Sequence, residues 1–163
     1  MENSLIAPEL YPPDSFITIW RISLNTNGPL NRWYYPRIPS ATLLGEDKIT
    51  PRICFCRELI YCLDAIPGAE YIDIDTPVIA FPLRISRNDP YFKPTREIMD
   101  NVPDACETNE CWYTHPVFLR GIRMSAENIL NEASPRTNWW EYLENRTQRT
   151  TGRSLHYEGP AYA

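Results

Sequence analysis

Alternating apolar and polar positions predict several short β-strands separated by proline-rich loops. The most regular segment is FITIWRIS at 16–23, which is rich in the β-branched and aromatic residues that favour strands. Further strands are predicted at 50–56, at 76–85 with a break at Pro82, at 110–119 and at 122–124. The segment 33–40 is extended and punctuated by prolines, and 86–109 is polar and proline-rich, so we expect mostly loop there.

Few segments have the spacing of an α-helix. In ELIYCLDAI at 58–66, the residues Leu59, Cys62, Leu63 and Ile66 follow the i, i+3, i+4, i+7 pattern of a helix with one buried face. Pro67-Gly68 then ends that helix. Shorter helices are predicted at 126–133 and 138–146.

The order of these elements predicts one α+β domain at 16–148, built on a mainly β split sheet with one or two short helices. Residues 1–15 are expected to form an extended arm, because Pro8, Pro12 and Pro13 block a helix. Residues 149–163 are expected to form an irregular tail.

Composition narrows the class of protein. The 163 residues carry 16 basic and 21 acidic side chains, for a net charge of −5, so a broad face for duplex nucleic acid is not expected. No apolar run is long enough for a membrane-spanning helix, and the first residues lack the pattern of a signal peptide. We therefore expect a cytoplasmic protein whose partners are neither membranes nor nucleic acid.

The five cysteines and the excess of arginine bear on possible sites. An odd number of cysteines favours reduced, buried thiols, although Cys54 and Cys56 could join Cys106, Cys111 or His115 in a zinc site. The usual Cys-x2-Cys pairs are missing, so no metal is expected. Lys48 and Lys93 are the only lysines, so 14 of the 16 basic residues are arginine, the better residue for gripping phosphate or carboxylate.

Familiar catalytic motifs such as glycine-rich phosphate loops, GxSxG and HExxH are missing from the sequence. Three features nevertheless follow in a suggestive order. Arg21 and Ser23 share one face at the end of the first strand, Phe55 lies in a strand that runs into the helix at 58–66, and Glu110 opens a late strand.

This order resembles the Arg–Ser–Glu form of the ADP-ribosyltransferase superfamily, and also the RES-type toxins that degrade NAD. The resemblance implies an ADP-ribosyltransferase-like fold and NAD as substrate. It implies that Arg21, within Trp20-Arg21-Ile22-Ser23, holds a phosphate of NAD, that Phe55 is the aromatic beside the nicotinamide ribose, and that Glu110 is catalytic. Where the superfamily has Ser or Thr, this chain has Cys56, so Ser23 and Thr50 are the candidates for that hydroxyl.

The chain also resembles a group of uncharacterised bacterial and phage proteins, over 16–125. The shared residues are Pro36-Arg37-Ile38-Pro39, Glu46-Asp47, Thr50-Pro51-Arg52-Ile53-Cys54-Phe55, Cys62-Leu63, Val102-Pro103-Asp104, and Glu110 with Trp112. Arg52 in this pattern has two interpretations: it contacts the cofactor, or it pairs with Glu46 and Asp47 and fixes the loop between them.

Two functions follow from the sequence. The first is an enzyme that cleaves the nicotinamide–ribose bond of NAD, either as a transferase to an unknown protein or small molecule or as a glycohydrolase. The second is a non-catalytic protein with a degenerate ligand pocket that occupies a partner surface through Trp33-Tyr34-Tyr35 or Trp139-Trp140, since aromatic residues dominate interface energetics.

Overall fold

The computed structural model describes residues 11–39, 46–65, 71–100, 102, 105–133, 140–142 and 144. The predicted tail at 149–163 and most of the predicted helix at 138–146 lie outside these residues, as do the first ten residues of the predicted arm.

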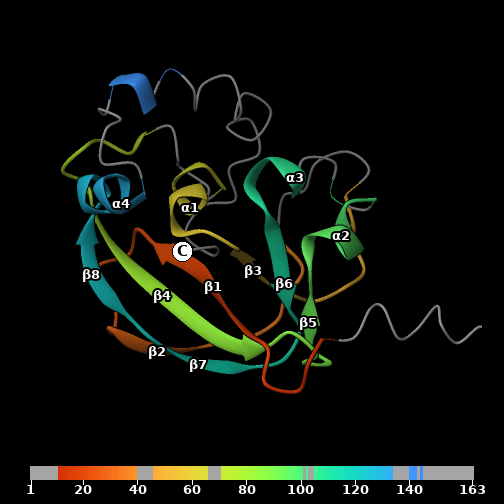
Figure 1. Ribbon diagram of the computed structural model, residues 1–163. Helices are drawn as coiled ribbons and strands as arrows, with labels where there is room; N and C mark the ends of the chain where they lie inside the picture. The colour runs from red at the N-terminus through yellow and green to blue at the C-terminus, as the bar shows by residue number, and fades with distance from the viewer. Residues whose placement is uncertain are drawn as a thin grey trace, which may run out of the picture.

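A six-stranded antiparallel sheet forms the centre of the fold (Figure 1). Its strands, in the order β5-β6-β3-β1-β4-β8, are β5 (Phe92–Lys93), β6 (Glu110–Tyr113), β3 (Ile53–Cys56), β1 (Phe16–Ser23), β4 (Pro77–Ser86) and β8 (Ile122–Ser125). A second, two-stranded antiparallel sheet pairs β2 (Asn31–Tyr34) with β7 (Val117–Arg120). The α+β class with a mainly antiparallel sheet is confirmed.

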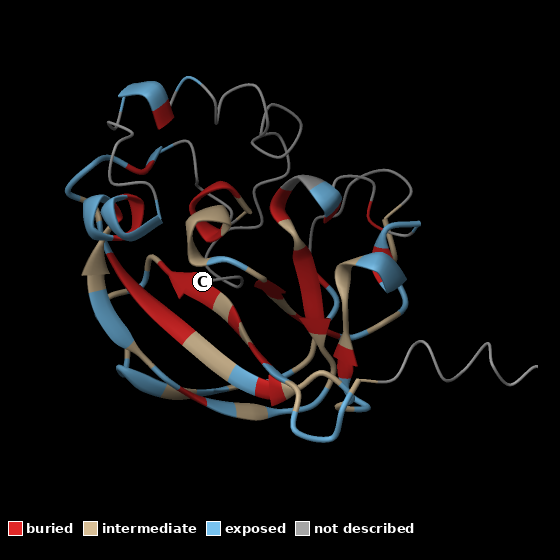
Figure 2. Ribbon diagram, in the orientation of Figure 1, coloured by how far each residue is buried: buried red, intermediate tan, exposed pale blue. Residues whose placement is uncertain are grey.

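Two apolar layers cover the central strands, which are the most buried part of the fold (Figure 2). On one face, α1 (Leu59–Ala65) and α4 (Ala126–Ala133) pack on Ile22 of β1 and on the strand beside it. On the other face, β2 and β7 pack on Ile17 and Ile19. The alternation within 16–23 therefore gives each face of β1 its own core, as a strand buried on both sides requires.

Two further helices cover the β6 end of the sheet. They are α2 (Thr95–Ile98) and α3 (Ala105–Thr108), and they enclose Trp112 in a small third core with Ile98, Val102 and Ala105. The expectation of mostly loop over 86–109 did not include β5 and these two short helices, which add to the helices predicted at 58–66 and 126–133. Each of these elements is four residues or shorter, so it is too brief to leave a periodic pattern.

Two predicted strands differ from the observed ones. β4 continues through Pro82 without a break, because β8 pairs only with Pro77–Ala80, so the missing N–H faces a side without a neighbouring strand. The single strand predicted at 110–119 is two strands. β6 pairs with β3 and β5, and the chain then passes Pro116 into β7, which pairs with β2.

Candidate functional site

A small pocket opens where β1 and β3 separate. The two strands are joined in register only at Trp20 and Cys56. The pocket beside this pair is lined by Trp20, Arg21, Ile22, Cys54, Phe55, Cys56, Cys62, Ala65 and Glu110. The cavity has a volume of about 20 Å³, which is enough for about one water molecule. Three of the predicted site residues, Arg21, Phe55 and Glu110, are therefore brought to one pocket.

Arg21 connects three strands beside this pocket. Its side chain is buried, and its Nη1 donates a hydrogen bond to the carbonyl oxygen of Cys54 at 2.9 Å. Its guanidinium lies 4.7 Å from the ring centroid of Tyr34 on β2, within cation–π range. The cation is thus held at the point where β1 and β3 diverge.

Glu110 stands at the start of β6 and is only 6% exposed. Its Oε2 accepts a hydrogen bond from Nε1 of Trp112 at 2.9 Å. The preceding residue, Asn109, has a φ of 51°, a left-handed conformation that asparagine adopts more readily than most residues. That conformation turns the chain out of α3 and into β6, and Thr95 then donates to the backbone carbonyl of Glu110 at 2.7 Å.

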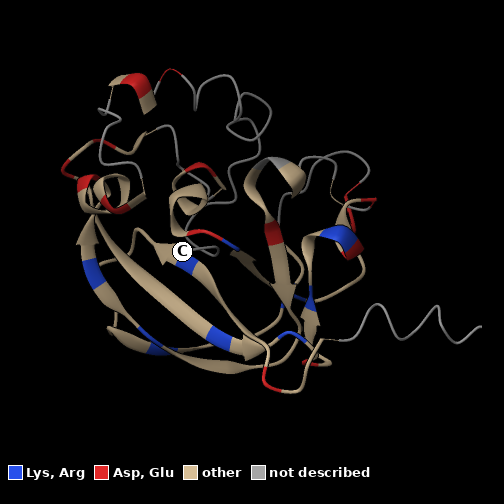
Figure 3. Cartoon of the chain, in the orientation of Figure 1, with Lys and Arg blue, Asp and Glu red and all other residues tan. Residues whose placement is uncertain are grey.

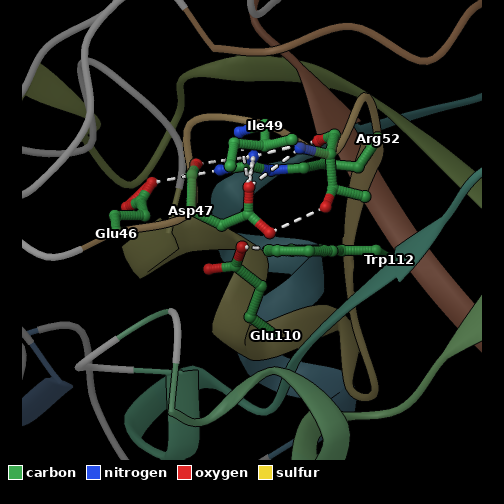
Figure 4. Close-up of polar contacts among 7 residues, drawn as sticks. Glu46, Asp47, Ile49, Arg52, Glu110 and Trp112 are labelled. Atoms are coloured by element: carbon green, nitrogen blue, oxygen red, sulfur yellow. Dashed lines mark hydrogen bonds and ion pairs between the residues drawn. The ribbon is translucent and has the colours of Figure 1, made fainter.

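Arg52 supports Glu110 through Trp112 (Figure 4). Its side chain is fully buried and lies 3.3 Å from a carboxylate oxygen of Glu46 and 3.9 Å from one of Asp47. Its guanidinium also lies 4.3 Å from the ring centroid of Trp112. The interpretation that Arg52 pairs with Glu46 and Asp47 is confirmed. Arg52 is not among the described residues that line the pocket; it contacts Trp112, which in turn donates to Glu110.

Neither candidate hydroxyl lines the pocket among the described residues. Ser23 is fully buried, and its Oγ accepts a hydrogen bond from the backbone N–H of Asn25 at 3.0 Å. Thr50 donates its hydroxyl to Asp47 at 2.8 Å. The two groups that do line the pocket from β3, besides Phe55, are the cysteines Cys54 and Cys56.

The cysteines are all free thiols. Cys111 is fully buried on β6, and this burial, followed by the nearby Cys56 and Glu110, raises the pKa of its thiol well above its usual range. Within the described residues, no three His, Cys, Asp or Glu side chains are grouped as metal ligands. None of the described helices is long and apolar enough to cross a membrane.

Two partners of the site were not predicted as such. Trp112 had been noted only within the shared pattern, yet its position two residues after Glu110 in a strand places both side chains on one face. Tyr34 comes from β2, and nothing local in the sequence connects it with Arg21.

No protein-family model matches the chain, and no curated protein or solved structure matches it. The chemistry of the pocket therefore has to be argued from its own geometry.

Proposed function

We propose that the chain is an NAD-consuming enzyme, an ADP-ribosyltransferase or NAD glycohydrolase, with an ADP-ribosyltransferase-like form of the α+β fold. The observation that carries this proposal is the convergence of Arg21, Phe55 and Glu110 on one pocket. These residues come from three different strands of one sheet, and the sequence resemblance had selected each of them for a role in a single site.

The proposed reaction needs an anion-binding group and a carboxylate, and no metal. The bond between the nicotinamide nitrogen and the ribose carbon breaks, nicotinamide leaves as a neutral molecule with the bonding electrons, and positive charge develops on the ribose. The Glu110 carboxylate accepts a hydrogen bond from a ribose hydroxyl and stabilises that charge. Water or an acceptor nucleophile then attacks the ribose carbon and loses its proton.

Arg21 is proposed to hold a phosphate of NAD, because a guanidinium donates to phosphate with good geometry. Its bond to the Cys54 carbonyl orients the guanidinium at the pocket. The present space of about 20 Å³ is smaller than a nicotinamide ring, so the proposal requires the pocket to widen when NAD binds.

The test is to incubate the purified protein with labelled NAD, alone and with cell lysate, and to score nicotinamide release and transfer of label. The proposal predicts release by the wild type and a loss of at least about 100-fold in Glu110→Gln, the scale of a removed transition-state contact. Glu132→Gln, which changes an exposed carboxylate on α4, is the matched control and should leave the rate unchanged.

The second candidate function is binding to a partner protein, and exposed aromatic rings favour it. Trp33 is 56% and Tyr35 62% exposed, and the two rings stack with centroids 6.3 Å apart. Phe118 on β7 lies beside them, with its ring centroid 5.6 Å from that of Trp33. This candidate predicts that a partner retained from lysate is lost in Trp33→Ala; retention of no partner, or equal retention by that variant, would contradict it.

A further inference from the structure

A second and larger cleft lies at the β5 end of the molecule. It consists of two adjoining hollows with volumes of about 340 and 450 Å³. The hollows share four lining residues, Tyr11, Arg57, Pro94 and Arg96. The walls come from the segment that precedes β1, the turn after β4, and β5 with α2. The residues that follow β3 and precede β6 complete the lining.

Four basic side chains line this cleft: Arg57, Arg87, Lys93 and Arg96. None of the four forms an ion pair with a carboxylate of the described residues. Figure 3 shows the basic residues of β5 and α2 at the same end of the folded molecule. Against the three carboxylates that also line the cleft, these four cations leave its lining with a net charge of +1, in a protein whose net charge is −5.

Three carboxylates also line the cleft, and one of them is already engaged. Asp89 accepts hydrogen bonds from the backbone N–H of Tyr91 at 2.8 Å and from the hydroxyl of Tyr113 at 3.0 Å. Glu58 and Glu97 are exposed, as is Arg96, whereas Arg57, Arg87 and Lys93 are partly buried, so solvent screens the two carboxylates more than these three cations.

Tyr11 lines both hollows and contacts two of the cations, Arg87 and Arg96. Its backbone N–H donates to Oδ1 of Asn88 at 3.0 Å, and the side-chain amide of Asn88 donates back to its carbonyl at 2.8 Å. The guanidinium of Arg87 lies 5.0 Å from the ring centroid of Tyr11, and Arg96 donates to the phenol oxygen at 3.4 Å. The charge of Arg96, followed by a hydrogen bond with Arg87, lowers the pKa of this phenol, as cationic neighbours do.

Arg57 lies where the two hollows meet. Its backbone N–H donates to the carbonyl of Asn109 at 3.1 Å. Its Nε is buried and has no hydrogen-bond partner within the described residues. A buried donor without a partner is costly, so Arg57 brings a guanidinium with an unused donor to the lining of the cleft.

We propose that this cleft binds the pyrophosphate or polyphosphate group of a small molecule. Arginine side chains from separate elements surround a space with room for more than one phosphate, and guanidinium groups donate pairs of hydrogen bonds to phosphate oxygens. A nucleic-acid strand fits less well, because the cations are confined to one cleft of an otherwise acidic chain. This site is separate from the pocket of Arg21 and Glu110 and does not depend on NAD turnover.

The test is calorimetric titration of the protein with inorganic pyrophosphate at low ionic strength, repeated at higher ionic strength and with orthophosphate. Pyrophosphate should bind more tightly than orthophosphate, and added salt should weaken binding. Arg87→Gln and the double variant Lys93→Gln/Arg96→Gln should each weaken binding by roughly tenfold or more. Arg120→Gln, which removes an exposed arginine of β7 outside the cleft, is the matched control and should bind as the wild type does.

The inference would be overturned if the wild type did not bind pyrophosphate, or if the cleft variants bound it as tightly as the wild type. If Arg21→Gln abolishes binding while the cleft variants keep it, the anion occupies the other pocket; that result overturns this inference and supports the proposed function. Arg96 is exposed, so Arg96→Gln alone serves as the test if the double variant fails to fold.

Discussion

At the scale of single residues, the position of Glu110 depends on two side chains that lie outside the lining of its pocket. Trp112 donates to its carboxylate, and Arg52 lies over the indole while it pairs with Glu46 and Asp47. A loop at 46–50 and the start of β6 are thereby joined through one buried tryptophan (Figure 4).

Replacing Trp112 with phenylalanine tests this connection. Phenylalanine keeps a smaller aromatic ring but lacks the indole N–H, so the buried Oε2 of Glu110 loses a donor, and we expect the free energy of unfolding to fall by about 1–3 kcal/mol. Nicotinamide release should fall as well, because the carboxylate is less well oriented. Chemical denaturation measures the first effect. Trp140→Phe, at a side chain that is 77% exposed, is the control, and equal stability of the two variants would contradict the proposed connection.

The residues of the site could be predicted from sequence only in part. Arg21, Phe55 and Glu110 were selected by their order along the strands together with the resemblance, and the structure brings all three to one pocket. Ser23 and Thr50 had the right chemistry, but their hydroxyls are used in local turns with Asn25 and Asp47. The cation cluster of the second cleft escaped notice because Tyr11 and Arg87 are brought together only by the tertiary structure.

At the scale of elements, the passage from β7 to β8 depends on a close approach at Gly121. A Cβ added there would lie 2.3 Å from the carbonyl oxygen of Leu30 and 2.5 Å from Cγ2 of Ile79. Leu30 immediately precedes β2, and Ile79 belongs to β4. Gly121 therefore allows the two sheets to come together where the chain crosses between them.

Gly121→Ala should destabilise the fold by about 1–3 kcal/mol or more, since the nearest contact is backbone and cannot rotate away. Gly28→Ala is the matched control. A Cβ there would have its closest contact at 3.3 Å, with the side chain of Asn25, so the expected change is within about 0.5 kcal/mol. Thermal and urea unfolding of both variants measure the difference, and a Gly121→Ala protein as stable as the control would contradict this role.

The long periodic segments could be predicted at this scale, and the short ones could not. The strand at 16–23 and the helix at 126–133 have the predicted bounds, because each carries a full period of apolar residues. The segment 86–109 folds into pieces of two to four residues that depend on packing around Trp112 and Phe92. Pro82 was a misleading signal, because which side of a strand lacks a neighbour is a property of the whole sheet.

At the scale of the whole molecule, Tyr113 links β6 to the turn that follows β4. Its hydroxyl donates to Oδ2 of Asp89 at 3.0 Å. Burial, followed by this bond and the charge of Asp89, raises the pKa of Tyr113 to about 12, from about 10 for an unperturbed tyrosine. A group whose pKa is higher in the folded state stabilises the fold fully below its unfolded pKa.

The contribution of Tyr113 should therefore be complete below about pH 10 and be lost between about pH 10 and 12. Urea unfolding across this range should show a steeper loss of stability for the wild type than for Tyr113→Phe, which has no phenol to ionise. Tyr71→Phe, at a side chain that is 79% exposed, serves as the control. Equal pH dependence in the wild type and Tyr113→Phe would contradict the role of this hydrogen bond.

A small pocket and a larger cleft share two short segments of the chain, Cys56-Arg57 and Asn109-Glu110. Glu110 lines the first, while Arg57 and Asn109 line the second. The order of elements predicted an α+β sheet, but no local signal predicted the strand order that makes these two sites neighbours. If both proposals hold, a phosphorylated ligand binds close to the carboxylate that cleaves NAD.

The central claim is that Glu110 cleaves the nicotinamide–ribose bond, and nicotinamide release from labelled NAD tests it most directly. Release by the wild type and Glu132→Gln, with a loss of at least about 100-fold in a folded Glu110→Gln protein, is the predicted result. Equal release by Glu110→Gln, or no release and no NAD binding by the wild type, would contradict it. In the second case, binding to a partner protein through Trp33, Tyr35 and Phe118 would become the leading function.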